Sequence, residues 1–381
     1  MPLSNYWEVF NCLRCGVSAP RNRKGIVFGS NFLCDYCALK KITLSIVVPV
    51  GKIDDAYGYC VDSLGSLMDV PDEIILVFDG ISEDERPEYP NLPWFRTEVL
   101  KAKCGPGRAR NIGARRATGD LLVFIDSDVS VPRDLLRRIS NLFRSRPSLD
   151  AAFGSYDDAP KERNFLSQYR NLLHHYVHQN ANEEASTFWA GCGIIRRSVF
   201  FDIGGFREDM HGIEDVELGY RLNERKHAIY LCKTLQVTHL KHWSAVKMMR
   251  TDFFVRALPW VELIFERRSR LINDLNSTYR DRFLVANAYL LVFVSVASPW
   301  IGWSGSIFIL GSLLLGFFVL SHRFCFFLAE KRGFFFASFA LFWQWMFYIL
   351  IGLALGIGSV DCLVMKKFRK RFAMAGDYCA G

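Results

Sequence analysis

The 381-residue sequence has no internal repeat and no low-complexity tract, so nothing in it indicates a repeat architecture. Its first ten residues, MPLSNYWEVF, contain neither the basic segment nor the apolar segment of a secretory signal. We therefore expect a reducing compartment, in which the 11 cysteines are thiols or metal ligands rather than disulfides.

Four cysteines near the N-terminus form two Cys-x-x-Cys pairs, separated by 18 residues. This spacing predicts a zinc-ribbon-like module over residues 1–41, with one Zn²⁺ bound by Cys12, Cys15, Cys34 and Cys37. Two disulfides are the alternative, which the missing signal argues against. The role of the module stays open: a structural cap, a docking module or a nucleic-acid contact. Mild charge and the lack of a recognition helix argue against nucleic acid.

Three long apolar runs follow residue 283, at 283–302, 303–320 and 334–358. Each is near or above the ~20 residues that span a bilayer, which predicts transmembrane or re-entrant helices over 283–365. Three full crossings would separate the basic run KKFRKR from a cytoplasmic catalytic domain, against the positive-inside tendency. We therefore expect the first two runs to form a hairpin and the third to be re-entrant or interfacial.

Basic residues flank these runs and contribute to the net charge of +8. Residues 247–282 interleave aromatic and aliphatic side chains with arginines, which predicts amphipathic helices at the membrane interface. A helix packed on a protein core is the alternative. Residues 366–381 read as a basic cytoplasmic tail, and both segments predict contact with anionic membrane lipids.

Residues 42–246 have the pattern of an α/β domain. The strand-like runs 43–50 and 72–80, the helical stretch 107–120 and the strand-like run LLVFIDSDV (121–129) alternate, which predicts a mostly parallel sheet. The last run ends in Asp126-Ser127-Asp128, where an open sheet presents ligand-binding groups. Two carboxylates so spaced can reach one hard divalent cation, although the motif alone is weak evidence.

The region 43–245 resembles the family 2 glycosyltransferases, which are inverting enzymes of Rossmann-like GT-A fold. The resemblance depends on several motifs in order. They are Pro49 at the end of an entry strand, Asp79, Ala109-Arg110-Asn111, the Asp-x-Asp motif at 126–128, and Glu214-Asp215.

The resemblance implies a nucleoside-diphosphate sugar donor, bound with Mn²⁺ or Mg²⁺ held by Asp126 and Asp128. Some relatives use a histidine near His239 as a third ligand, and a purely structural histidine is the alternative. The predicted donor-binding residues are Pro49, Val50, Asp79, Arg108, Arg110, Asn111, Asp126 and Ser127. For the arginines, a solvated basic helix face is the alternative.

The acceptor side is placed by the same resemblance. Gly191, Cys192 and Gly193 would line the acceptor site, and Lys241 and Trp243 stand where processive relatives carry an Arg-Trp pair. The full Gln-x-x-Arg-Trp pattern is absent, so processive polymerisation has no support. Asp215 would be the general base, with Glu214 beside it.

Together these features predict an integral membrane, metal-dependent hexosyltransferase whose catalytic domain faces the cytoplasm. Membrane anchoring suggests a lipid-linked acceptor: polyprenyl phosphate, a polyprenyl-linked saccharide or a glycolipid. For a phosphate acceptor, Asp215 would orient it rather than take a proton. A non-catalytic scaffold that binds a partner through the zinc ribbon is the alternative. A nucleotidyltransferase would normally show a glycine-rich loop, which the segment after Pro49 lacks. The sequence does not indicate the donor, the acceptor or the oligomeric state.

The four paired cysteines should bind one zinc ion, since thiolates at this spacing match tetrahedral ligation. Elemental analysis of the purified chain should give about one zinc per chain, and a Cys34→Ser, Cys37→Ser double variant should lose it. Replacing the scattered Cys232 by serine is the control and should retain the metal. Intramolecular disulfides without zinc would contradict this prediction.

Overall fold

The computed structural model describes residues 42–87, 94–267 and 278–364, and four short strands ahead of residue 42. In antiparallel pairs, β1 (Val9–Asn11) lies beside β2 (Ser18–Pro20), and β3 (Gly25–Phe28) beside β4 (Asn31–Cys34). Cys12, Cys15 and Cys37, the side chain of Cys34 and the 366–381 tail lie outside the described residues, so zinc binding stays a prediction.

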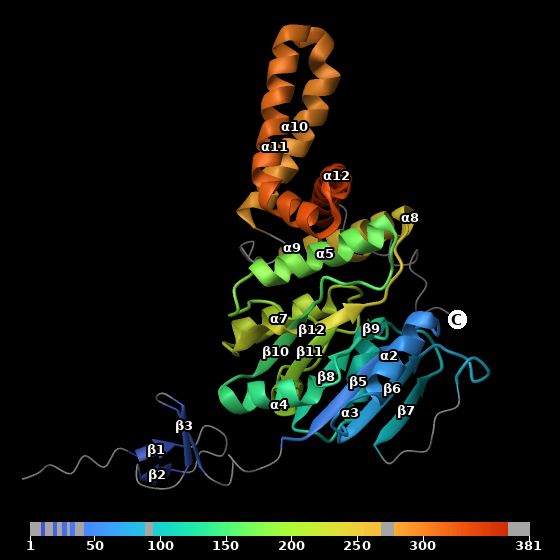
Figure 1. Ribbon diagram of the computed structural model, residues 1–381, viewed down its shortest axis with the longest axis vertical. Coiled ribbons are helices and arrows are strands. Elements are labelled where there is room, and N and C mark those ends of the chain that lie inside the picture. Colours follow the sequence, from blue (N-terminus) through green and yellow to red (C-terminus); the bar gives the residue numbers. More distant parts are fainter. Residues whose placement is uncertain are drawn as a thin grey trace, which may run out of the picture.

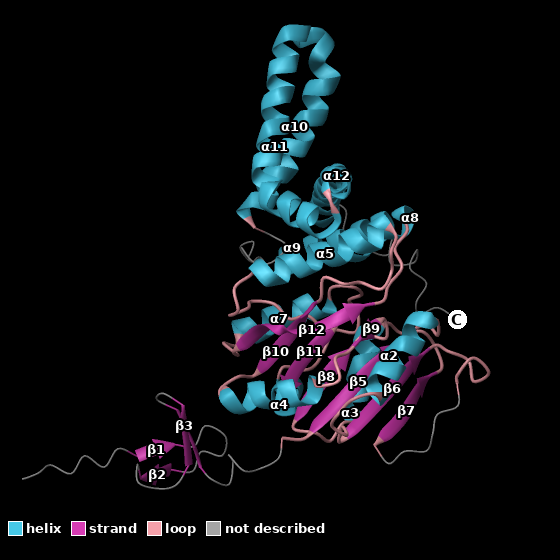
Figure 2. Cartoon of the chain, in the orientation of Figure 1, coloured by secondary structure: helices cyan, strands magenta, loops and turns pink. Residues whose placement is uncertain are grey.

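An eight-stranded mixed sheet forms the centre of the molecule (Figure 2). Its order is β7-β6-β5-β8-β11-β10-β12-β9. The strands are β5 (Leu44–Val50), β6 (Glu73–Asp79), β7 (Phe95–Leu100), β8 (Leu121–Ile125), β9 (Val129–Ser130), β10 (Ala151–Tyr156), β11 (Cys192–Arg196) and β12 (Ile229–His239). The strands predicted at 43–50, 72–80 and 121–129 are confirmed.

The expectation of a mostly parallel sheet holds fully for one half, and in the other half only β10 and β12 are parallel neighbours. In the first half, β7, β6, β5 and β8 are parallel neighbours. In the other half, β11 runs antiparallel to both β8 and β10, and β9 runs antiparallel to β12. The sequence did not reveal this reversal because β10 and β11 are short buried runs whose direction depends on the path of the chain between them.

Helices cover both faces because β5, β6 and β8 are buried along their whole length. One apolar core joins the sheet to α2 (Asp55–Gly65) and α4 (Leu135–Ser145). A second core joins the opposite face to α3 (Pro106–Arg116), α6 (Arg197–Asp202) and α7 (Glu214–Glu224). The helix predicted at 107–120 is α3.

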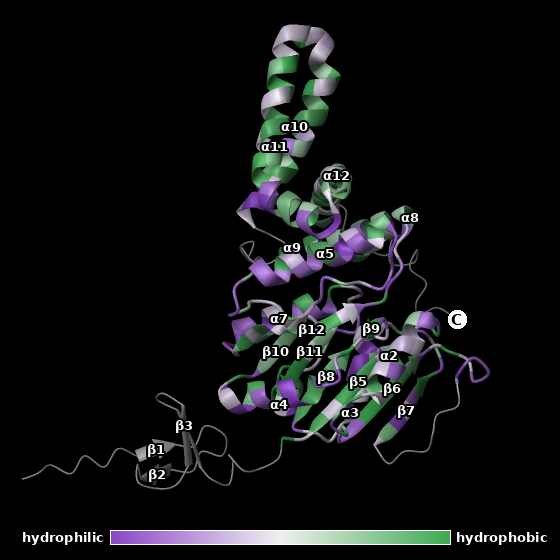
Figure 3. Ribbon diagram, viewed as in Figure 1, coloured by the Kyte–Doolittle hydropathy of each residue, from purple (hydrophilic) through white to green (hydrophobic). Residues whose placement is uncertain are grey.

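The C-terminal part is helical throughout its described residues. α8 (Ala245–Arg250), the π-helix η1 (Thr251–Ala257) and α9 (Leu258–Arg267) lead to α10 (Tyr279–Ile301), α11 (Trp303–Arg332) and α12 (Phe334–Val364). The last three are long and apolar enough to cross a membrane. In Figure 3 most of the α10–α11 ribbon is green, the hydrophobic end of the scale.

The hairpin reverses at Gly302, where the two predicted runs 283–302 and 303–320 meet, with φ of 90°. Figure 1 looks nearly down the axis of α12, whereas α10 and α11 extend along the long axis of the view. This steep angle is what a re-entrant or interfacial third helix requires, and that placement stays a prediction.

The apolar helices share a core with the α/β domain. α5 (Phe165–Asn180) lies between the sheet and these helices in Figure 1, and its Tyr169 packs in one cluster with Trp243, Phe324 and Ala337. Polar contacts adjoin this core. Lys331 Nζ lies 2.7 Å from Asp158 Oδ2, and Arg332 Nε donates to Gln168 Oε1 at 2.7 Å. The domain is therefore held directly against the helices.

Candidate active site

The Asp-x-Asp motif forms a tight turn between β8 and β9. The Val129 N–H donates to the Asp126 carbonyl at 3.1 Å, which closes the turn. The Asp126 N–H donates to the Gly191 carbonyl at 3.3 Å, and the Leu240 N–H donates to the Asp128 carbonyl at 2.9 Å. The turn is thus attached to the segments that begin β11 and follow β12, and three predicted site regions meet there.

Arg110 joins this turn to the Glu-Asp pair. The residue is 4% exposed on α3. Its guanidinium donates to Asp126 Oδ1 at 2.5 Å through one nitrogen and to Glu214 Oε1 at 2.7 Å through the other. Glu214 also accepts from the Gly212 N–H at 2.6 Å. Arg110 therefore positions two carboxylates, and both of its terminal nitrogens are engaged by protein rather than held open for a phosphate.

Lys241 lies on the other aspartate, with its Nζ 3.0 Å from Asp128 Oδ2. Burial would raise the pKa of Asp128, but Lys241 and His239 outweigh it and lower this pKa to about 2. Burial, only partly offset by Arg110, raises the pKa of Asp126. Each carboxylate of the motif thus has its own protein cation, and Asp128 is fully ionised at neutral pH.

His239 ends β12 beside this turn, and its ring stacks on Tyr156 at a centroid distance of 4.3 Å. Burial lowers the pKa of His239 to about 3, so the imidazole is neutral. Across residues 42–87, 94–267 and 278–364, however, no three His, Cys, Asp or Glu side chains converge to hold a metal ion. The predicted three-residue set is therefore not assembled in this structure.

Two partly exposed carboxylates on one turn nevertheless fit Mg²⁺ or Mn²⁺. Such ions are commonly held through one or two carboxylates, while substrate phosphates and water complete the oxygen shell. Asp126 and Asp128 have side-chain exposures of 30% and 24%, so both are accessible to a ligand. Lys241 occupies one oxygen of Asp128 and would compete with a cation there.

Asp215 begins α7 next to Glu214, as the sequence predicts. Its Oδ2 accepts from the Ala190 N–H at 3.1 Å, and its Oδ1 accepts from the Val216 N–H at 2.8 Å. Burial and the neighbouring charge of Glu214 raise the pKa of Asp215 to about 7, although Arg110 and the two N–H groups act in the opposite direction. A carboxyl with this pKa can take and release a proton at neutral pH.

Two predicted donor-binding residues have structural partners. Asp79 is 3% exposed, and its two oxygens accept from the N–H groups of Cys104 and Gly105 at 2.7 and 2.8 Å. Asn111 exchanges hydrogen bonds with the backbone of Phe206 at 2.8 and 2.9 Å. Asp79 fixes the loop that leads into α3, and Asn111 fixes the loop ahead of α7. Both support the loops around the site, and direct contact of these residues with a donor stays a prediction.

Other predicted residues lie at varied depth. Arg108 is half exposed, and its Nε lies 3.7 Å from Glu208 Oε2. This environment matches the alternative interpretation, in which Arg108 belongs to a solvated basic face of the helix. Pro49 and Val50 are buried at the end of β5, and Ser127 occupies the accessible turn.

On the acceptor side, the Cys192 side chain is buried in the first apolar core, so only its backbone could line an acceptor site. Gly193 packs against Phe188, whereas Gly191 adjoins the Asp-x-Asp turn. A Cβ on Gly191 would collide with the Trp189 ring, so glycine is needed for this close approach. Trp243 is 1% exposed, and its ring cannot face a substrate directly.

Sequence reasoning missed several charged residues beside the site. Arg170, Lys247 and Arg256 lie over the Trp243 ring from α5, α8 and η1, and Asp252 pairs with both arginines. Arginines alternate with aromatic residues from 248 onward, a pattern that predicts either an interfacial helix or a helix packed on a protein core. The second alternative could have indicated these charges.

Comparison with known proteins agrees with this geometry. The sequence model of Glycosyl transferase family 2 matches residues 45–204. The chain is 30% identical over 227 residues to a pre-mycofactocin glycosyltransferase of Mycobacterium tuberculosis, covering 54% of this chain and 45% of that protein. It is 23% identical over 252 residues to glycosyltransferase GlyA of Streptococcus pneumoniae, covering 60% and 35%. This chain thus spans less than half the length of these relatives.

Among solved structures, a mannosyltransferase from Pyrobaculum calidifontis in complex with GDP-Man and Mn²⁺ superposes with a TM-score of 0.48 at 16% identity. That superposition covers 87% of this chain and 89% of the other. Staphylococcus aureus TarS residues 1–349 superpose with a TM-score of 0.43 at 17% identity, over 59% of this chain and 66% of that one.

Replacing Arg110 by methionine should destabilise the protein by about 3–5 kcal/mol, because Asp126 and Glu214 would lose their shared buried cation. The matched control is Arg108→Ala on the same helix, which removes a half-exposed arginine and should change stability by less than about 0.5 kcal/mol. Denaturant unfolding of the full chain in uncharged detergent measures both. Equal stability of the two variants would contradict a bridging role.

The matched segment, residues 45–204, contains Arg110 and Asp126 and is similar to Glycosyl transferase family 2.

Proposed function

We propose that this chain is a membrane-anchored, inverting glycosyltransferase of GT-A fold. It would transfer a sugar from a nucleoside diphosphate to a lipid-linked acceptor at the cytoplasmic membrane face. The observation that carries the proposal is the Arg110 bridge, which brings the Asp-x-Asp turn and the Glu214-Asp215 pair into one site. Family similarity over residues 45–204 supports the same reaction class.

The donor diphosphate is assigned to the turn at Asp126 and Asp128. A divalent cation held there would neutralise charge on the leaving diphosphate, as Mg²⁺ or Mn²⁺ does in other phosphate sites. Asp126 is oriented by Arg110, and Asp128 is held ready by Lys241. Lys241 would move off Asp128 when the cation binds and could then pair with a donor oxygen. His239 lies next to Asp128 and stacks on Tyr156. It would serve either as a neutral third metal ligand or only to hold the Tyr156 ring in place.

Asp215 is assigned to the acceptor. In an inverting transfer, the acceptor oxygen attacks the anomeric carbon while the bond from that carbon to the diphosphate oxygen breaks. A hydroxyl acceptor gives up its proton in this step, and Asp215 would receive it. Two backbone N–H groups donate to the Asp215 carboxylate, so the partners that orient it belong to the backbone and not to another side chain.

The lipid-linked acceptor is inferred from the apolar helices. Three helices of membrane-spanning length follow the domain, and α11 and α12 share a core with α5. A lipid held in the bilayer would present its head group near the catalytic domain. The basic 366–381 tail supports a cytoplasmic orientation through the positive-inside tendency.

Asp128→Asn and Asp215→Asn should fail in different ways. Asp128→Asn should weaken metal-dependent binding of nucleoside diphosphate together with turnover, because its charge serves the diphosphate in the ground state and at the transition state. Asp215→Asn should leave nucleotide binding nearly intact and reduce turnover on the order of 10² to 10⁴-fold. Calorimetry with GDP or UDP and Mn²⁺, beside turnover assays over a panel of nucleotide sugars, measures both effects. The reversed pattern would exchange the two roles, and full activity of both variants would exclude this site.

Turnover on a hydroxyl acceptor should depend on pH through Asp215. The raised pKa of about 7 means that the carboxyl is protonated below this pH and unable to accept a proton. The rate should therefore fall about tenfold per pH unit below pH 7 and level off above it. Initial rates from pH 5.5 to 8.5 at saturating donor test this. The residual rate of Asp215→Asn is the control and should lack this inflection. A flat profile for the unmodified protein would show that Asp215 orients the acceptor instead.

A further inference from the structure

Four basic side chains surround Trp243, which is 1% exposed. The cationic atoms lie 5.2 to 5.9 Å from its ring centroids, and the four residues are Lys241, Arg170, Lys247 and Arg256. We call these four residues the Trp243 cluster. They come from α5, the segment after β12, α8 and η1, so the cluster forms only where the catalytic domain meets the membrane-side helices. Cations over an indole face are stabilised by its ring electrons.

Acidic partners neutralise only half of this cluster. Asp252 is 3% exposed and is shared by Arg170 and Arg256, while Asp128 pairs with Lys241. Direct ion pairs set these four positive charges against two carboxylates, and no carboxylate within the described ranges lies within 4.0 Å of the Lys247 ammonium. Like charges held this close repel one another unless an anion lies among them. The excess of two positive charges matches a phosphate.

The local backbone directs these charges inward. η1 is a π-helix of seven residues. This conformation is rare in proteins overall, and where it occurs it often lies at a functional site. It buries Asp252 and half-buries Arg256, while Phe254 and Val255 are exposed. A Cβ on Gly212 would meet Val255, so η1 packs against the loop that leads to Glu214 and Asp215.

The cluster reaches the reacting groups. Lys241 contacts Asp128 directly. η1, which carries Arg256, packs through Val255 on Gly212, two residues before Glu214, and its other neighbour is α12. An anion bound by Arg256 and Lys247 would therefore lie on the membrane side of the same site.

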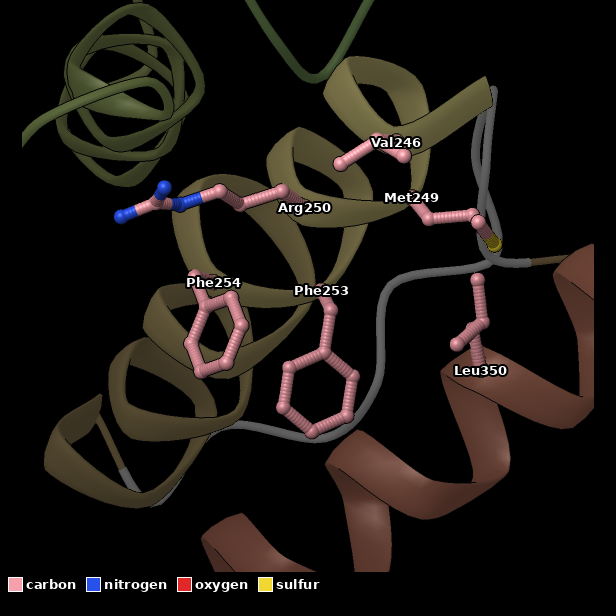
Figure 4. Close-up of a pocket in the computed structure, with 6 residues that line it drawn as sticks. All are labelled: Val246, Met249, Arg250, Phe253, Phe254 and Leu350. Carbon is pink, nitrogen blue, oxygen red and sulfur yellow. The ribbon is translucent and has the colours of Figure 1, made fainter.

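A wide-open apolar cavity of about 420 Å³ lies on the surface of α8 and η1, with Leu350 of α12 on its other side. Figure 4 shows Met249 and Phe253 on the side of Leu350, with the Arg250 guanidinium extended away from it. A hydrocarbon chain fits such a lining, which is almost entirely apolar. Cationic groups and an apolar cavity thus lie on neighbouring parts of the same two helices.

We propose that the Trp243 cluster binds a phosphate group of the acceptor lipid and that the lipid chain occupies the cavity between α8–η1 and α12. This inference rests on the proposed function and narrows its acceptor to a lipid carrying a phosphate or diphosphate. Polyprenyl phosphate and a polyprenyl-diphosphate-linked saccharide both have this chemistry, whereas an uncharged glycolipid does not. The charge excess and its position between Asp215 and α12 carry the assignment.

Calorimetry on the full chain in uncharged detergent tests the assignment with farnesyl phosphate, farnesol and inorganic phosphate as probes. Farnesyl phosphate should bind tightest, because it alone uses both the cations and the cavity. Lys247→Ala should weaken its binding about tenfold, the loss typical of one charge-assisted contact. The matched control is Arg144→Ala, an exposed arginine on α4, which should leave binding unchanged.

Arg256 supplies a second variant and a readout of charge. Arg256→Gln should weaken farnesyl phosphate at least as much as Lys247→Ala does, and Arg256→Lys should restore part of the affinity. Equal melting temperatures of the variants would show that folding is retained. Should Arg256→Gln unfold, the Lys247→Ala result alone decides the matter.

Three outcomes would overturn the proposal. They are equal binding of farnesyl phosphate by the Lys247→Ala and unmodified chains, equal binding of farnesol and farnesyl phosphate, and equal binding of inorganic and farnesyl phosphate. The first two outcomes would show that the cations do not bind the phosphate group, and the third would show that the lipid chain does not contribute to binding. Binding of GDP or UDP with Mn²⁺ is measured on the same samples. If the unmodified protein binds neither nucleotide, the proposed function is wrong. If it binds nucleotide and any of the three outcomes above is found, only the acceptor assignment is wrong.

Discussion

The buried guanidinium of Arg110 is the interaction on which the site depends. It lies between Asp126 and Glu214, two carboxylates that are 88 residues apart in the sequence. Without it, two partly or fully buried negative charges would face each other with no shared cation, and α7 would lose its electrostatic link to β8. The packing of α3 on β5 and β6 fixes the backbone of Arg110, and Asn111 fixes the loop that precedes α7. The geometry of the carboxylates therefore follows from how one helix packs on the sheet.

A second constraint is the core that α5 shares with α11 and α12. Tyr169, Phe324 and Ala337 belong to one apolar cluster, and ion pairs from Arg267 to Glu217 and Glu224 attach α9 to α7. The membrane-side helices are thus packed on the catalytic domain rather than tethered to it. Trp243 belongs to the same cluster, so the cations around it are held in place by the contact between the two parts. Movement of α5 relative to η1 would separate Arg170 from Asp252 and disperse the charges.

The sequence predicted the elements whose patterns are local. Buried β-branched runs identified β5, β6 and β8, and ordered motifs identified Asp126, Asp128 and Asp215 as neighbours. It could not predict partners, which depend on packing between distant segments. Asp79 was assigned to the donor because of its place at a strand end, but its oxygens accept from Cys104 and Gly105. Arg110 was expected to face phosphate, yet its partners come from β8 and α7. Cys192 was expected to line the acceptor site, and its side chain packs in the apolar core from the start of β11.

The layer formed by α5 also sets a height. It lies between the sheet and the apolar helices in Figure 1, packing on β10 and β12 on one side and sharing an apolar cluster with α11 and α12 on the other. Because α5 contacts both layers, its width, roughly 10 Å for one helix, sets the spacing between the sheet and the apolar helices. A change in the packing of α5 would therefore alter the distance between these helices and the Asp-x-Asp turn.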